Sequence, residues 1–160
     1  YRLCCRWLRW IRTISTTTMT IKTYLGFDVG TKRTGVAIAN SLTAHANGIE
    51  TVIHNKDGST NWKDLEGLIS QHNPDGFIVG LPLDKDNQEQ EMTFIAKSFA
   101  RKLEQRFKTP VFFIDEYLSS SEAKNQLKWH YAHKNADRAD VDKRSAELIL
   151  QTWLNETTHD

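Results

Sequence analysis

The sequence predicts an α/β domain in which a mixed five-stranded sheet is flanked by helices. Three apolar runs joined by short polar connections come first, at 23–29, 35–40 and 48–54, which favours an antiparallel meander. Apolar runs then alternate with segments of helical period, as they do where helices pack on parallel strands. The expected order of elements is β-β-β-α-β-α-β-α-α.

The first three strands are joined by polar connections with turn-forming residues. Residues 30–34 read Gly-Thr-Lys-Arg-Thr and are expected to close a hairpin. The third strand has a weaker pattern and is followed by a polar loop at 55–58. The first helix is then expected to begin from Ser59 and Thr60. Its apolar residues recur at helical spacing: Trp62, Leu65, Leu68 and Ile69.

Strands and helices alternate in the second half of the chain. The continuous apolar run 76–81 is typical of a strand buried on both faces. A long helix follows, whose apolar stripe is Met92, Ile95, Phe99, Leu103 and Phe107. Residues 111–114 form the next apolar run, which predicts the fifth strand.

Two further helices are expected near the C-terminus. Glu122 stands three residues after Ser119, the spacing of a capping box, so a helix is expected to start there. The polar, basic stretch 130–139 lacks an apolar period and is predicted to be a mobile loop. The last helix is expected from about Val141. Its apolar face comprises Ala146, Ile149, Leu150 and Trp153.

The composition is that of a soluble globular protein, with 160 residues, 39% hydrophobic and 26% charged. These values exclude a collagen-like, a disordered and a disulfide-rich chain. The formal charge of +1 depends on residues 1–18, which hold four arginines and no acid. Without them, 17 basic residues stand against 20 acidic ones, a net charge of −3. Cys4 and Cys5 lie in the same stretch, so 19–160 can hold no disulfide, zinc–thiolate site or cysteine nucleophile.

Residues 1–18 are expected to be an upstream extension or an artefact, either disordered or a basic helix. Met19 is then the natural start, and 19–160 form one domain. An Arg-rich, Thr-rich segment without acids also has the composition of a transit peptide. Its apolar runs are too short for a signal peptide or a membrane span.

Asp28 is the first of several acids at the ends of predicted elements. It lies inside an apolar strand, where a carboxylate is costly to bury unless it is paired or binds a metal. The alternative is a structural role in which Asp28 caps the following turn through Thr31. The glycines at 26, 30 and 35 are expected to let a large anionic ligand approach the backbone beside it.

The other candidate acids follow the fifth strand and begin the last helix. Asp115 and Glu116 stand where ligands gather in such sheets, although a solvated strand exit is the alternative. Asp142 shares the buried stripe of the last helix, although any acid in a first turn also interacts favourably with the helix dipole. If these carboxylates meet, they need a cation, and hard oxygen ligands suit Mg²⁺ or Mn²⁺. Two such ions can activate water for phosphodiester cleavage.

Four segments of the chain resemble motifs of the YqgF/RuvX family, in the family's order and spacing. They are GFDVGTKRTGVA at 26–37, IVGLPL at 78–83, DEYLSSSEA at 115–123 and DKRSA at 142–146. The resemblance extends over about 23–156. It departs from the family where Tyr117 replaces an arginine and Asn87 replaces a glycine.

The resemblance implies an RNase H-like fold related to Holliday-junction resolvases. It implies a nuclease of the bacterial cytoplasm that processes pre-16S rRNA in ribosome biogenesis. It also implies that Asp28, Glu116 and Asp142 form the catalytic and metal-binding triad with Mg²⁺ or Mn²⁺, and that Asp115 is a possible further ligand.

Basic residues near these acids are candidate contacts to substrate phosphates. Lys32 and Arg33 follow Asp28 closely. Lys128, Lys134 and Arg138 belong to a basic–aromatic stretch that suits nucleic acid, although a solvated loop explains it equally well.

Three hypotheses follow for the function. The first is a metal-dependent endonuclease that acts on the 5′ end of pre-16S rRNA or on a Holliday junction in DNA. The second is a non-catalytic, nucleic-acid-binding ribosome assembly factor, which the charge of −3 and Tyr117 favour. The third is an actin-like ATPase, which needs two such domains where this chain has one. We expect a cytoplasmic monomer or homodimer without a membrane partner, and cleavage of a junction requires two active sites.

Overall fold

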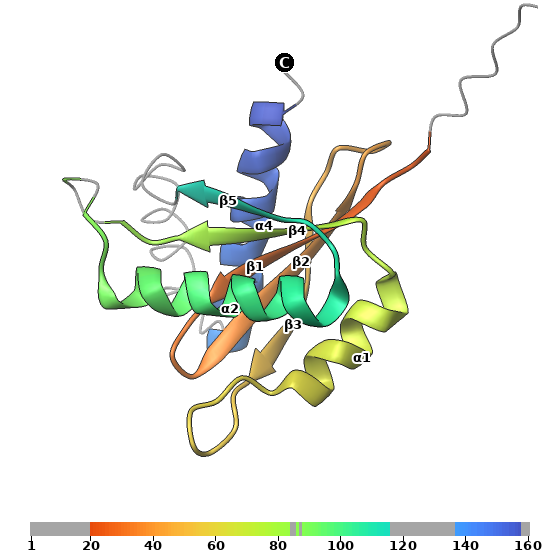
Figure 1. The fold of residues 1–160 in the computed structure, drawn as a ribbon. Helices are drawn as coiled ribbons and strands as arrows, with labels where there is room; N and C mark the ends of the chain where they lie inside the picture. The colour runs from red at the N-terminus through yellow and green to blue at the C-terminus, as the bar shows by residue number, and fades with distance from the viewer. Residues whose placement is uncertain (1–19, 84–85, 87, 116–136, 158–160) are drawn as a thin grey trace, which may run out of the picture.

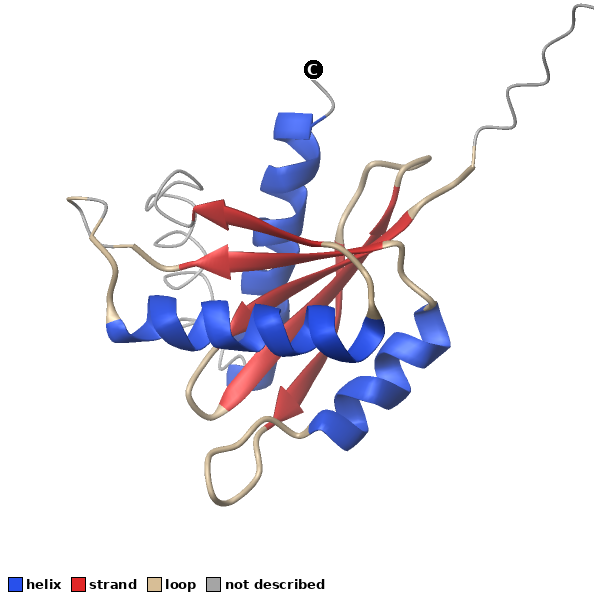
Figure 2. Ribbon diagram, viewed as in Figure 1, coloured by secondary structure: helices blue, strands red, loops and turns tan. Residues whose placement is uncertain are grey.

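The computed structural model describes residues 20–83, 86, 88–115 and 137–157. Within them, one five-stranded sheet carries helices on both faces (Figures 1 and 2). The strands are β1 Thr23–Val29, β2 Arg33–Asn40, β3 Asn47–Ile53, β4 Gly76–Leu81 and β5 Val111–Asp115. The helices are α1 Trp62–His72, α2 Glu91–Phe107 and α4 Arg138–Thr157.

The sheet is mixed and has the order β3-β2-β1-β4-β5. Strands β1, β2 and β3 pair antiparallel as a meander. Strand β4 returns through α1 to lie parallel to β1, and β5 returns through α2 to lie parallel to β4. The predicted α/β architecture and its strand order in the chain are therefore confirmed.

Alternation along the strands divides the core between the two faces of the sheet. Leu25, Phe27 and Val29 of β1 pack with the apolar stripes of α1 and α2 on one face. On the other face, Ile149 and Leu150 of α4 lie in a second cluster with small residues of β2. Because β4 and β1 are covered on both sides, they read as continuous apolar runs.

Three element boundaries differ from those expected. Strand β2 begins two residues earlier, because Arg33 still pairs with Ile53 of β3. Helix α1 is capped by Asn61, whose side chain accepts a hydrogen bond from the Asp64 amide, and not by Ser59 or Thr60. Helix α4 begins inside the expected loop 130–139, where the Asp137 carboxylate accepts a 3.4 Å hydrogen bond from the Ala139 amide.

Several expectations fall outside the described residues. They concern the segment 1–18 with Met19, the helix expected from Ser119, and residues 130–136 of the loop. Within the described ranges, no helix is long and apolar enough to span a bilayer.

Candidate active site

Asp28 lies near the end of β1 and faces α4. Its neighbours Phe27 and Val29 point into the core beneath α1 and α2, so strand alternation turns Asp28 to the opposite side. Gly26 shares that side, because a Cβ at this position would lie 2.7 Å from Leu150 Cβ of α4. Asp28 is partly buried. It therefore belongs to the face that α4 covers.

Gly35 brings Asp28 and Asp142 to the same place. In the antiparallel register, Gly35 of β2 lies directly opposite Asp28. A Cβ at Gly35 would overlap the main-chain carbonyl oxygen of Asp142. The first turns of α4 can therefore rest on the sheet only because this position has no side chain. Gly35 is thus next to the main chain of both acids, which places Asp28 and Asp142 near the turn of the β1–β2 hairpin.

The structure corrects our expectation for the glycines. We expected Gly26, Gly30 and Gly35 to leave the backbone open to a large anionic ligand. Instead, α4 occupies the space beside Gly26 and Gly35. Gly30 lies inside the hairpin turn, where its amide donates a 2.8 Å hydrogen bond to the Arg33 carbonyl oxygen. Gly26 and Gly35 therefore serve the packing of α4, and Gly30 serves the turn.

Asp142 is paired with Arg33 of β2. The Arg33 Nε atom lies 2.8 Å from Asp142 Oδ2, and the two side chains are 33% and 25% exposed. Asp142 Oδ2 is nonetheless shielded from solvent and receives no well-directed hydrogen bond from the described residues. The pair is therefore close in distance but poorly oriented. The partial burial of Asp142 agrees with its expected place on the inward stripe of the helix.

The acids after β5 divide by strand alternation. Ile114 packs in the core beneath α4, and Phe113 lines a pocket with residues of α2 on the opposite face. Asp115 shares the side of Phe113 and is partly buried. It therefore turns away from Asp28 and Asp142. Glu116, the triad member that the resemblance implies, lies outside the described residues.

The predicted phosphate-binding residues are only partly described. Lys32 is exposed at the hairpin turn beside Arg33. Arg138 is exposed at the start of α4, one helical turn before Asp142. Lys128 and Lys134 lie outside the described residues.

His54 was not singled out from the sequence, and it fastens the turn that carries Lys32 and Arg33. Its amide donates to the Lys32 carbonyl oxygen at 2.9 Å. Its ring Nδ1 lies 3.1 Å from the Thr31 carbonyl oxygen, and its Nε2 lies 2.9 Å from the hydroxyl of Thr34, which is fully buried. Since a carbonyl only accepts, Nδ1 donates the hydrogen bond to Thr31, and Nε2 forms the second hydrogen bond with the Thr34 hydroxyl. No periodicity marks such a residue, because its role depends on β3 lying beside the turn.

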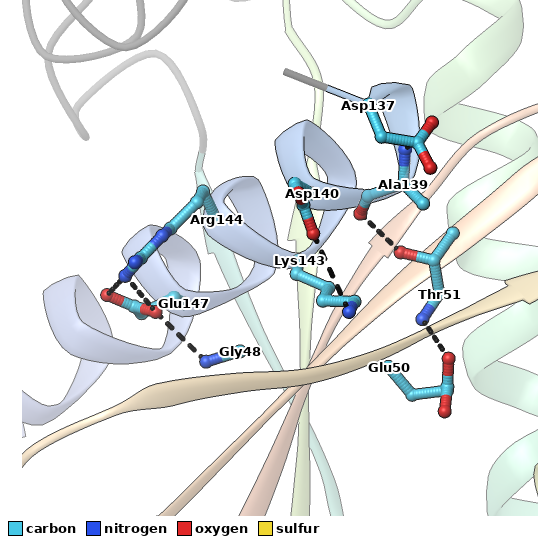
Figure 3. A network of polar contacts seen from close by, with 9 residues as sticks. All are labelled: Gly48, Glu50, Thr51, Asp137, Ala139, Asp140, Lys143, Arg144 and Glu147. Carbon is cyan, nitrogen blue, oxygen red and sulfur yellow. Dashed lines mark hydrogen bonds and ion pairs between the residues drawn. The ribbon is translucent and has the colours of Figure 1, made fainter. Parts of the chain in front are cut away.

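A polar network ties the N-terminal half of α4 to the edge strand β3 (Figure 3). The Glu147 carboxylate accepts a 2.9 Å hydrogen bond from the Gly48 amide and is paired with Arg144. The Thr51 hydroxyl donates to the Ala139 carbonyl oxygen at 2.7 Å. These contacts fix the distance between the sheet and the turn of α4 that carries Asp142.

The donor set at this site fits a divalent cation. Carboxylate oxygens are the hard ligands that Mg²⁺ and Mn²⁺ prefer, and the shielded Asp142 Oδ2 lacks a well-directed donor. Within residues 20–83, 86, 88–115 and 137–157, no group of three or more acidic, His or Cys side chains forms a complete metal site. The described part of the chain holds two of the predicted ligands, Asp28 and Asp142, and the third, Glu116, lies outside it.

Comparison with solved structures defines the class of the fold. The chain is similar to RuvC of Thermus thermophilus in complex with a Holliday junction substrate, with a TM-score of 0.57 and 11% identity over 86% of this chain and 96% of that one. It is also similar to the fowlpox virus resolvase bound to Holliday junction DNA, with a TM-score of 0.54 and 14% identity over 84% and 98%. The fold is therefore the RNase H-like fold of the resolvases.

Sequence comparison narrows this class to one family of nucleases. A protein of Aeromonas salmonicida is 41% identical over 138 residues, which cover 86% of this chain and 98% of that protein. One of Saccharophagus degradans is 44% identical over 136 residues, covering 84% and 94%. Both bear the name "Putative pre-16S rRNA nuclease". The family RuvX, described as Holliday junction resolvase, matches residues 22–156, and the chain belongs to it.

Proposed function

We propose that the chain is a metal-dependent endonuclease that hydrolyses phosphodiester bonds beside the turn of the β1–β2 hairpin. The observation that carries this proposal is the position of Gly35, which pairs with Asp28 across the hairpin and lies against the main chain of Asp142. A site of this kind lies on rigid elements, since β1, β2 and α4 all contribute to its walls.

Asp28, Asp142 and Glu116 are the proposed catalytic carboxylates and metal ligands. Asp28 and Asp142 would hold Mg²⁺ or Mn²⁺ from the sheet and from the helix. The bound metal supplies Lewis-acid polarisation of the phosphate and an activated water. Because Asp115 turns toward α2, it is the weaker candidate for the third ligand, which leaves Glu116 as the proposed one.

Lys32 and Arg33 are the proposed contacts to the phosphates next to the cleaved bond. Both extend from the turn that His54 fastens, so their main chain is held in place. Lys128, Lys134 and Arg138 are proposed to contact the nucleic acid farther from the reacting phosphate.

The proposed substrate is the 5′ end of pre-16S rRNA in ribosome precursors, as the names of the relatives suggest. A bacterial enzyme with this substrate works in the cytoplasm. A four-way DNA junction is the alternative substrate, which the family description and the resolvase fold favour. Cleavage of a junction requires two active sites and therefore a homodimer, whereas a monomer has the one active site that cleavage of rRNA requires.

The test compares cleavage of a 5′ pre-16S rRNA segment and of a four-way DNA junction with and without Mg²⁺ or Mn²⁺. Asp28→Asn and Asp142→Asn should each lower the cleavage rate by more than about a hundredfold, since even outer partners of metal ligands matter about 10- to 100-fold. Asp140→Asn, an exposed acid in the same turn of α4, is the matched control and should retain activity. If the wild type cuts neither substrate, or if Asp142→Asn cuts as fast, the proposal fails.

A further inference from the structure

The contact between Arg33 and Asp142 joins two residues to which the proposed function gives different partners. One is a proposed metal ligand and the other a proposed phosphate contact. They lie 2.8 Å apart, and the acceptor oxygen receives no well-directed hydrogen bond from the described residues. A partly exposed, poorly oriented ion pair contributes little stability, so another cation can displace it at low cost.

The main chain of Arg33 is fixed, whereas its side chain is long and flexible. The Arg33 carbonyl oxygen accepts from the Gly30 amide, and Arg33 pairs with Ile53 of β3. His54 forms hydrogen bonds with the carbonyl oxygens of Thr31 and Lys32, the two residues before Arg33. The guanidinium can therefore leave Asp142 without any movement of the hairpin or of α4.

Arginine is suited to both partners in chemical terms. Its planar guanidinium pairs with carboxylates and phosphates through the same donors and stays charged at all relevant pH values. Clustered carboxylates need a cation in either state. Before metal binds, Arg33 is the cation beside Asp142 in the described residues.

We propose that Arg33 is a built-in counter-cation that competes with the divalent metal for Asp142. When the metal takes Asp142, the released guanidinium becomes available for a phosphate of the substrate. This inference rests on the proposed function, because it needs both the metal and a phosphate-containing substrate. It adds an order of events, in which metal loading precedes the tight binding of the nucleic acid.

The test is a titration of the full chain with Mn²⁺, without nucleic acid, in which free Mn²⁺ is followed by electron paramagnetic resonance. Arg33→Gln removes the charge and should tighten Mn²⁺ binding about fivefold, the size expected when a partly exposed ion pair no longer competes. Arg33→Lys keeps the charge and should stay within about twofold of the wild type. Weaker or unchanged binding by Arg33→Gln would mean that Arg33 orients Asp142 or is irrelevant to it, and would overturn the proposal.

Lys32→Gln is the matched control for the general electrostatic effect of removing a positive charge from the hairpin. It removes one positive charge from the adjacent, exposed residue and should change Mn²⁺ affinity by less than about twofold, because exposed charges are screened by water and salt. An equal gain for both variants would show a general electrostatic effect, and would overturn the specific competition. Thermal unfolding of each variant confirms that it is folded.

A second measurement separates this inference from the proposed function. At saturating Mn²⁺, Arg33→Gln should raise the KM for cleavage of the rRNA segment about tenfold, the scale of one charge-assisted contact. Cleavage by the wild type together with weaker Mn²⁺ binding by Arg33→Gln refutes the counter-cation and leaves the nuclease intact. Tighter Mn²⁺ binding without cleavage of any substrate refutes the nuclease and leaves the competition intact. A wild type that binds no Mn²⁺ refutes the competition.

Discussion

At the scale of single residues, the proposed active site depends on the missing side chain of Gly35. The position of Gly35 beneath Asp142 allows α4 to approach the sheet closely, and its pairing with Asp28 places both acids at one end. Gly48 plays the same part on β3, where a Cβ would lie 2.8 Å from the Lys143 carbonyl oxygen. Small residues under the helix thus set the depth at which Asp142 lies.

We expect Gly35→Ala to lower the free energy of unfolding by about 1–3 kcal/mol, because the added methyl group collides with the main chain of α4. It should also lower cleavage more than the loss of folded protein explains, since Asp142 is lifted from Asp28. Urea denaturation and cleavage rates measure the two effects.

Gly67→Ala is the control for the glycine substitution. Gly67 lies within α1, and a Cβ there meets nothing within 4 Å. Alanine in a helix should raise the free energy of unfolding by up to about 1 kcal/mol. A Gly35→Ala protein as stable and active as the wild type would contradict the close packing.

At the scale of elements, α4 is fixed at both ends by different interactions. Its N-terminal half is hydrogen-bonded to β3 (Figure 3). Its C-terminal half is held by Trp153, whose ring centroid lies 4.9 Å from that of Tyr24 and 5.5 Å from that of Phe112. Tyr24 and Phe112 belong to β1 and β5, so the helix spans the sheet that presents the acids.

The β1–β2 hairpin is the second element that shapes the site, and we expect His54→Ala to loosen it. The buried Thr34 hydroxyl would lose its partner, which should lower the free energy of unfolding by about 1–3 kcal/mol. Because Lys32 and Arg33 would be held less firmly, the KM for cleavage should rise as well. Chemical denaturation and steady-state kinetics measure these changes.

Two variants show whether the effect belongs to this contact. Thr34→Val combined with His54→Ala should cost less than the sum of the single changes, because both act on one hydrogen bond. His45→Ala removes an exposed histidine in the β2–β3 connection and should change the free energy of unfolding by less than about 0.5 kcal/mol. Additive effects of Thr34→Val and His54→Ala would contradict a role for the hydrogen bond between these two side chains.

At the scale of the whole molecule, the sheet separates two cores that stabilise it together. The larger core lies beneath α1 and α2 and includes stacked and edge-to-face aromatic rings, such as Phe27 against Phe99 at 5.4 Å. The smaller core lies beneath α4. Among the described residues, the face that carries Asp28 and Asp142 is therefore the one with the smaller apolar cluster.

We expect Leu150→Ala to lower the free energy of unfolding by about 2–5 kcal/mol, since Leu150 is fully buried between α4 and the sheet. Hydrogen exchange of α4 amides should accelerate more than that of α2 amides, because the cavity lies beneath α4. Leu42→Ala, at a side chain that is 73% exposed, should have almost no effect. Equal acceleration in both helices would mean that the two cores open together.

The sequence by itself determined the strands and helices that the structure describes and the class of fold, because strand and helix periods and turn residues are local properties. It also determined the candidate acids Asp28 and Asp142, since each interrupts an apolar pattern. Tertiary structure decided what surrounds them. Helix α4 packs against Gly26 and Gly35, Arg33 pairs with Asp142, and His54 fastens the hairpin. Each of these contacts joins residues far apart in the chain, and no local pattern records which surfaces meet when a helix packs on a sheet.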